Sequence, residues 1–187
     1  LEEAAVRCDA NRSRLALLFV DIDGFTAVNE GYGHGVGDTV LRQAAERMHR
    51  ASGDKLAATR LGGDEFLLLV PGGEDAARRQ AQALLDALEQ PFDLGAGCAV
   101  KLAASIGIAG YPQHGACSRL VGHASTAMRE VKQAGGQAWA GPQSAQLQAG
   151  AHGHQPQRQS RLADALQGRG QRVHQAQAEQ VGDQTSH

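Results

Sequence analysis

The chain has 187 residues, 42% of them hydrophobic, so it is long enough for one domain with a real core and too short for two large ones. Its 18 basic and 20 acidic residues give a net charge of -2, which excludes the broad positive field that gathers nucleic acid or an anionic membrane. No apolar run approaches the ~20 residues that span a bilayer, and the three cysteines are far apart without a CxxC pair. We therefore predict a cytoplasmic chain without a membrane segment, a disulfide framework or a zinc site.

The first predicted elements are a helix end, a buried strand and an amphipathic helix. Residues 1–12 carry apolar side chains at roughly helical spacing, and residues 15–20 form a continuous apolar run that suits a strand buried on both faces. Residues 36–50 repeat apolar positions at three and four. This pattern predicts a helix with Asp38 in its first turn, where the helix dipole favours an acid.

The later elements alternate strands with helices. Two strands, a helix, one or two further strands and a last helix are expected, in that order, over residues 56–60 and 66–70, 76–88, 100–109 and 120–134. The first two strands are joined by Leu61-Gly62-Gly63-Asp64-Glu65, a tight glycine connection of hairpin type.

Acidic residues follow two of these strands. They are Asp21, Asp23, Asp64 and Glu65. Adjacent strand ends can bring carboxylates to one site, and such oxygen ligands suit Mg²⁺, which would activate an attacking hydroxyl and neutralise charge on a phosphate. Solvated turn residues are the alternative interpretation. Gly62 and Gly63 favour the site, because their backbone N–H groups can approach a ligand closely.

Several segments together resemble the GGDEF diguanylate cyclase family. Residues 60–66, Arg-Leu-Gly-Gly-Asp-Glu-Phe, look like its signature, and matches in order and spacing cover residues 14–140: Asp21-Ile22-Asp23-Gly24-Phe25, Val28-Asn29, Gly33-His34, Gly37-Asp38, Ala104 to Ala109, Ala127-Met128, Lys132 and Gly135. The resemblance implies an α/β fold with a mainly antiparallel central sheet flanked by helices, similar to the palm domain of polymerases. It also implies bacterial signalling by condensation of two GTP into cyclic di-GMP, with Mg²⁺ or Mn²⁺, by two domains that meet as a homodimer.

The resemblance also implies roles for individual residues. The metal would be held by the carboxylates of Asp21 and Asp64 and the carbonyl of Ile22, with Asp64 and Glu65 as the catalytic acids. The substrate-binding set would be Gly24, Phe25, Asn29, His34, Asp38, Gly62, Gly63 and Lys132, in which Asn29 and Asp38 read the guanine edge. The alternatives are a core residue for Phe25, a turn residue for Asn29, a surface-loop residue for His34 and a helix-terminal residue for Asp38.

Three departures from the family pattern bear on activity. Thr26 and Gly136 stand where the family has a lysine and an arginine, so two phosphate contacts are missing. Gly53 and Leu56 replace both charges of the RxxD product-inhibition motif. Two functions therefore stay open: a slow diguanylate cyclase, or a GTP-binding module that regulates a neighbouring domain.

The predicted domain covers residues 1–140, and residues 141–187 form a glutamine-rich linker or disordered tail. Residues 161–166 with Val173-His174 resemble the segment that joins a GGDEF domain to an EAL phosphodiesterase domain, although no EAL motif is present. The chain starts without Met and without the family's leading DxLTGLxNR segment, so we expect an excised piece of a longer protein. There is no GxxxxGK[ST] phosphate loop, and the calcium-loop and dinucleotide patterns each fail at a required position.

Overall fold

The computed structural model describes residues 1–53, 58–95, 97–141 and 148–149. Its helices are α1 (Glu2–Asn11), α2 (Phe25–Tyr32), α3 (His34–Ser52), α4 (Glu74–Leu88) and α5 (Cys117–Gln133). Its strands are β1 (Leu15–Asp23), β2 (Ala58–Gly62), β3 (Glu65–Pro71), β4 (Phe92–Gly95), β5 (Cys98–Val100), β6 (Ala103–Tyr111), β7 (Ala138–Ala140) and β8 (Gln148–Ala149).

The main sheet has six strands in the order β2-β3-β1-β6-β7-β8, and β4 and β5 form a separate hairpin. All neighbouring strands of the main sheet are antiparallel except β6 and β7. Strand β1 lies between β3 and β6, and residues 15–22 are buried along its length, which explains their continuous apolar run. The predicted fold class, a mainly antiparallel sheet flanked by helices, is confirmed.

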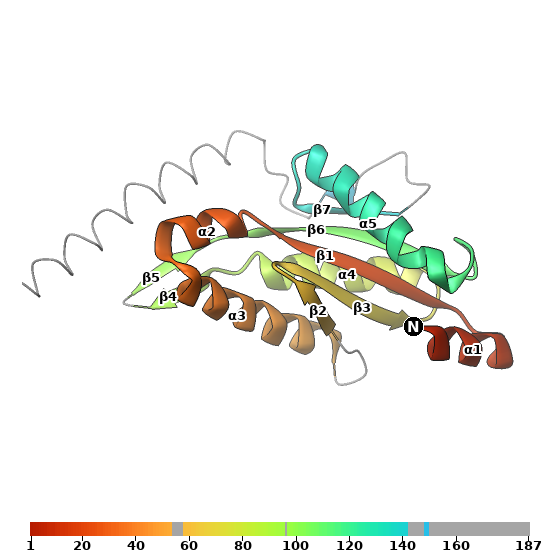
Figure 1. Cartoon of the computed structure of the whole chain (residues 1–187). Helices are drawn as coiled ribbons and strands as arrows, with labels where there is room; N and C mark the ends of the chain where they lie inside the picture. The colour runs from red at the N-terminus through yellow and green to blue at the C-terminus, as the bar shows by residue number, and fades with distance from the viewer. Residues whose placement is uncertain (54–57, 96, 142–147, 150–187) are drawn as a thin grey trace, which may run out of the picture.

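Helices cover both faces of the sheet (Figure 1). One core lies between the sheet and α3 and α4, and it contains the even-numbered residues of β1 from Ala16 to Ile22. The other core lies under α1 and α5 and contains the odd-numbered Leu15, Leu17 and Phe19. Helix α5 packs so closely on β6 that a Cβ atom at Gly107 would lie 2.5 Å from the backbone nitrogen of Met128.

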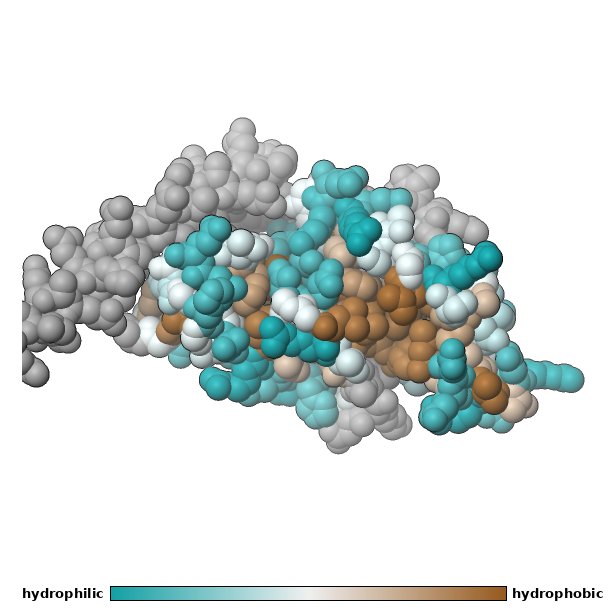
Figure 2. All heavy atoms as spheres, in the orientation of Figure 1, coloured by the Kyte–Doolittle hydropathy of each residue, from teal (hydrophilic) through white to brown (hydrophobic). Residues whose placement is uncertain are grey.

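Apolar surface remains visible over the central strands between the hydrophilic helices (Figure 2). On β3, Leu67 and Leu69 are only partly buried against the second core, and Leu61 near the end of β2 is 50% exposed. None of the helices in the described ranges combines the length and apolar composition needed to cross a membrane.

Three short features, α2, the β4–β5 hairpin and β7, were not predicted, and one prediction was wrong. Helix α2 begins directly after Gly24, whose φ of 83° sets the turn out of β1, and its eight residues are too few for a clear periodicity. Helix α3 already begins at His34, so Asp38 lies in its second turn and not in the first. The β4–β5 hairpin and β7 were missed because these strands have only three or four residues each.

The residues beyond 140 are described only at Gly141 and in β8, which pairs with β7. The rest of the predicted linker or tail, and Leu56 of the predicted strand and inhibition motif, lie outside the described residues.

Candidate functional site

The acidic residues converge at the end of β1. Asp21 lies directly opposite Glu65 on β3 and Ser105 on β6. Side chains that face each other across antiparallel strands point to the same side of the sheet. This side is the α5 side, because Leu67 and Phe19, at alternate positions on the same strands, belong to the core under α5. The predicted convergence of the two acidic segments is therefore confirmed.

Asp21 is the most enclosed of these acids. Its residue is 5% exposed, and the Nζ atom of Lys132, in the last turn of α5, lies 2.5 Å from its Oδ1 atom. Burial raises the pKa of Asp21 to about 6, and the charge of Asp64 also raises it, whereas the contact with Lys132 lowers it. Burial lowers the pKa of Lys132, but the hydrogen bond with Asp21 and the charges of Asp21, Asp23 and Asp64 together raise it overall. Burial thus disfavours the ionised form of Asp21, and a bound cation would stabilise that form.

Asp64 and Ile22 complete a possible metal-binding edge. The backbone N–H of Ile22 donates to the carbonyl of Asp64 at 3.3 Å, so the hairpin residue lies beside the end of β1. The side chain of Ile22 is 1% exposed in the opposite core, which leaves only its backbone for a ligand. Asp64 and Glu65 are half-buried at the hairpin.

These residues fit a magnesium site of the usual kind. Across the described residues, no group of three or more His, Cys, Asp or Glu side chains is arranged to hold a metal. Mg²⁺ needs only one or two carboxylates, because it keeps several waters and takes phosphate oxygens from the substrate. Asp21 and Asp64, whose charges repel each other, are the two carboxylates that could hold such an ion.

Asp23 has different partners from Asp21. The Ser105 hydroxyl lies 2.8 Å from Oδ1 and 3.0 Å from Oδ2 of Asp23, and the backbone N–H of Gln137 donates to Oδ2 at 3.1 Å. Burial raises the pKa of Asp23, and these hydrogen bonds lower it. Sequence reasoning missed Ser105 and Gln137. The signal available in the sequence was a polar residue, Ser105, within an apolar run. In the structure Ser105 is 0% exposed.

A second group of candidates lies where α2 meets α3. Asn29 is a half-buried residue of α2, and its side chain packs against Gly37, where a Cβ atom would also come within 3.2 Å of Phe25 Cζ. Asp38, the residue after Gly37, is exposed on α3. Asn29 therefore lies against the backbone next to Asp38, an approach that the absence of a side chain at Gly37 allows. Sequence reasoning assigned no such role to Gly37.

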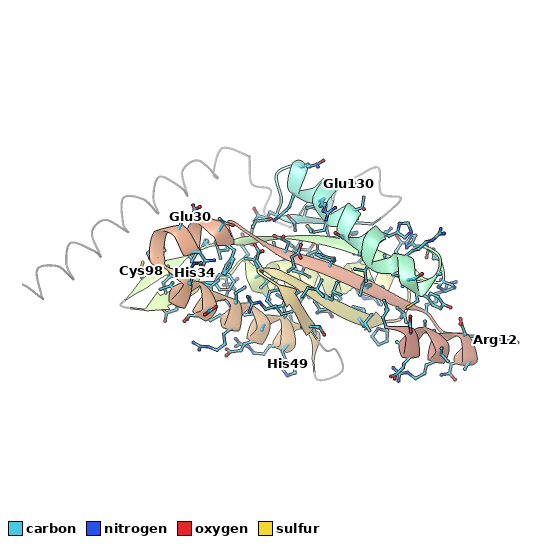
Figure 3. The ribbon with its side chains drawn as sticks, in the orientation of Figure 1. Arg12, Glu30, His34, His49, Cys98 and Glu130 are labelled. Atoms are coloured by element: carbon cyan, nitrogen blue, oxygen red, sulfur yellow. The ribbon has the colours of Figure 1, made fainter. Side chains whose placement is uncertain are left out.

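The remaining candidates of this region differ in exposure. Phe25 is 7% exposed in the larger core, which confirms the alternative interpretation of Phe25 as a core residue. His34 is exposed at the start of α3 and not in a loop, and Figure 3 marks it at the junction of α2 and α3. Gly24 is exposed between β1 and α2.

The glycines of the hairpin are open to solvent. Gly62 and Gly63 are exposed, and no atom lies within 4 Å of a Cβ built on either residue. The φ angle of Gly63 is 54°, and its carbonyl accepts a hydrogen bond of 2.9 Å from Arg60 Nε. A ligand can therefore approach this backbone without meeting a side chain at either glycine.

The two positions without the family's cations have different surroundings. Thr26 is exposed in the first turn of α2. At Gly136, in contrast, a Cβ atom would lie 2.5 Å from Asp23 Oδ2 and 3.2 Å from Ser105 Oγ. Position 26 therefore has room for a larger side chain, whereas position 136 does not.

Known proteins match this chain over most of its described length. Residues 1–138 match the family described as "Diguanylate cyclase, GGDEF domain". The bifunctional diguanylate cyclase/cyclic di-GMP phosphodiesterase MucR of Pseudomonas aeruginosa is 40% identical over 137 residues, which are 72% of this chain and 20% of MucR. The diguanylate cyclase TpbB of the same species is 42% identical over 111 residues, 57% of this chain and 25% of TpbB. The chain thus spans a quarter or less of these two relatives.

Solved structures agree with this similarity. The crystal structure of the GGDEF domain of TpbB (YfiN) has a TM-score of 0.71 and 34% identity, and the match covers 74% of this chain and 88% of that one. An EAL/GGDEF domain protein from M. capsulatus has a TM-score of 0.63 and 36% identity, with 72% and 94% covered.

Proposed function

Because the chain belongs to the GGDEF diguanylate cyclase domain family, we propose that it condenses two GTP molecules into cyclic di-GMP in the presence of Mg²⁺ or Mn²⁺. The observation that supports this most is the buried carboxylate of Asp21, next to Asp64 and in contact with Lys132. Each domain would hold one GTP, so the reaction needs two copies of the domain facing each other.

The proposed metal ligands are the carboxylates of Asp21 and Asp64 and the backbone carbonyl of Ile22. A bound ion neutralises phosphate charge and activates the attacking hydroxyl. Lys132, which is held beside Asp21, is suited to contact phosphate oxygens. Glu65 lies across the strands from Asp21, and we assign it, with Asp64, to the reacting hydroxyl.

GTP recognition is assigned to the α2–α3 region and the hairpin. A carboxylate at Asp38 can accept from the guanine N–H groups, and the amide of Asn29 adds a second polar contact, a pattern that adenine does not match. The exposed backbones of Gly24, Gly62 and Gly63 would lie along the phosphates, with His34 nearby and Phe25 supporting α2 from the core.

A GTP-binding module without turnover is the second candidate. It is favoured by Thr26, which carries no charge, and by Gly136, which carries no side chain at all. A hydrogen bond to a charged group contributes about 1.5–3 kcal/mol, so the loss of each phosphate contact would slow transfer by roughly 10- to 100-fold if it acted in the transition state.

The test is to measure cyclic di-GMP formation and GTP binding for the wild type and Asp64→Ala in the presence of Mg²⁺. We expect product from the wild type and none from Asp64→Ala. Asp86→Ala removes an exposed acid from α4, on the other side of the sheet, and should behave as wild type. If the wild type binds GTP with Mg²⁺ but forms no product, the cyclase proposal is wrong and the binding-module proposal takes its place. If the wild type does not bind GTP at all, both proposals are wrong.

We further propose that the domain acts in the cytoplasm within a longer bacterial signalling protein. MucR is described as a bifunctional diguanylate cyclase and cyclic di-GMP phosphodiesterase, and the M. capsulatus match is an EAL/GGDEF domain protein. The resemblance of residues 161–166 to a GGDEF–EAL junction supports an EAL domain as the neighbour.

A further inference from the structure

Asp23 connects the end of β1 to the segment that follows α5. Both of its carboxylate oxygens are engaged, by the Ser105 hydroxyl and by the backbone N–H of Gln137. Ser105 is fully buried, and Gly136 lies so close that a Cβ atom there would meet both Asp23 and Ser105. The carboxylate is thus bound on one side by the Ser105 side chain of β6 and on the other by the backbone that follows α5.

The segment held by Asp23 is continuous with the last turn of α5. Gly136 N–H donates to the carbonyl of Val131 at 2.9 Å, and Gly135 N–H donates to the carbonyl of Lys132 at 3.1 Å. These two bonds form a Schellman motif, and Gly135, with a φ of 115°, occupies the position where glycine is preferred. Fixing the positions of Gly136 and Gln137 therefore also fixes the last turn of α5, which carries Lys132.

Lys132 makes the second contact between the end of α5 and β1. Its ion pair with Asp21 lies two residues before Asp23 on the same strand. The side chain of Lys132 is 40% exposed, so solvent alone would leave this flexible chain many conformations. Two neighbouring contacts orient the helix end better than the ion pair alone, because a long, partly exposed lysine side chain can keep one contact in several conformations.

We propose that Asp23 is a positioning residue: it fixes the Gly135–Gln137 turn to the end of β1 and thereby holds Lys132 beside Asp21. The role of Lys132 toward phosphate rests on the proposed function, but the attachment of the turn does not. The close approach also explains why position 136 has no side chain, because Asp23 and Ser105 occupy the space that a side chain would need.

Amide hydrogen exchange of the metal-free, nucleotide-free protein tests the attachment. In Asp23→Ala we expect exchange at Gly135, Gly136 and Gln137 to become about tenfold faster or more, as for the loss of one hydrogen bond to a charged group. Met128, in the middle of α5, should not change. Ser105→Ala, which keeps the charge of Asp23, should give a smaller effect in the same direction. Unchanged exchange at residues 135–137 in both variants would overturn the proposal.

A double-mutant cycle tests the connection to Lys132, with the affinity for GTP and Mg²⁺ as the measurement. We expect Asp23→Ala to weaken binding about tenfold in the wild-type background and less than about twofold in Lys132→Met, because the two residues act together. Asp9→Asn is the control, since Asp9 accepts a 2.8 Å hydrogen bond from the Tyr111 hydroxyl at α1, and its effect should be equal in both backgrounds.

The outcomes separate the two proposals. An equal loss for Asp23→Ala in both backgrounds would mean that Asp23 contacts the ligand or the metal itself, and the positioning role would be wrong. If the wild type binds no GTP, the proposed function fails, and amide exchange alone decides whether Asp23 fixes the turn.

Discussion

Replacing Asp21 with asparagine should stabilise the metal-free protein at neutral pH. The fold raises the pKa of Asp21 from 3.8 to about 6, mainly through burial. This difference of about 2 pH units corresponds to about 3 kcal/mol at 1.36 kcal/mol per unit, and it opposes folding when the acid is ionised. Asparagine has nearly the shape of the protonated acid, so Asp21→Asn should recover up to about 3 kcal/mol at pH 7.5.

The sign of the pH dependence makes this prediction specific. Because the pKa in the folded state is higher than in the unfolded state, the folded protein binds more protons between pH 3.8 and about 6. The contribution of Asp21 is therefore most favourable below pH 3.8 and is lost as the pH rises through 6. Wild type and Asp21→Asn should differ little at pH 4 and most at pH 7.5.

Urea unfolding with EDTA at several pH values between 4 and 7.5 measures this difference directly. Addition of Mg²⁺ should reverse the order, because an ion that binds only the folded wild type stabilises it by mass action. A variant that is less stable than wild type by the same amount at every pH would refute the reasoning, since the carboxylate would then stabilise the fold.

Three further predictions concern nucleotide binding and turnover. Thr26→Lys should raise the turnover number by up to about 10- to 100-fold, more than it raises GTP affinity, because the added cation acts where charge develops; equal rises in both would contradict this. Gly37→Ala should push Asn29 away, lowering stability by about 1–3 kcal/mol and reducing the preference for GTP over ATP, whereas Gly35→Ala, with nothing within 4 Å, should do neither. Micromolar cyclic di-GMP should leave initial rates unchanged, because Gly53 cannot replace the arginine fork of the inhibition motif; strong non-competitive inhibition would reveal another site.

The central strand and the acidic end of the site were predictable because their physical signals are local. A continuous apolar run between charged residues indicates a strand covered on both faces, and residues 15–22 of β1 are buried. The glycine pair at residues 62–63 indicated a tight connection between two strands, and the pairing of the second of them, β3, with β1 places Glu65 opposite Asp21. The helices with clear periodicity, α3 to α5, were recognised for the same reason.

The polar contacts between distant segments were not predictable in this way. Asn29 was open to interpretation as a turn residue, whereas it lies on α2 and packs against Gly37, eight residues later. The bonds of Asp23 to Ser105 and Gln137 span 82 and 114 residues. No periodicity reports such pairs, because they depend on which strands become neighbours and on how a helix ends.

The two positions that lack the family's cations, Thr26 and Gly136, differ in whether the structure has room for a positive side chain. In the sequence, Thr26 and Gly136 look equivalent, since each stands where the family has a cation. In the structure, Thr26 is exposed on α2, whereas the space beside Gly136 is filled by Asp23 and Ser105. A positive side chain can be added at position 26 without displacing a buried group, but at position 136 it would have to break the contacts that fix the end of α5. A cation restored at position 26 can therefore distinguish a slow enzyme from a binding module. A substitution at Gly136 cannot, because it would disturb the end of α5 whichever of the two functions the domain has.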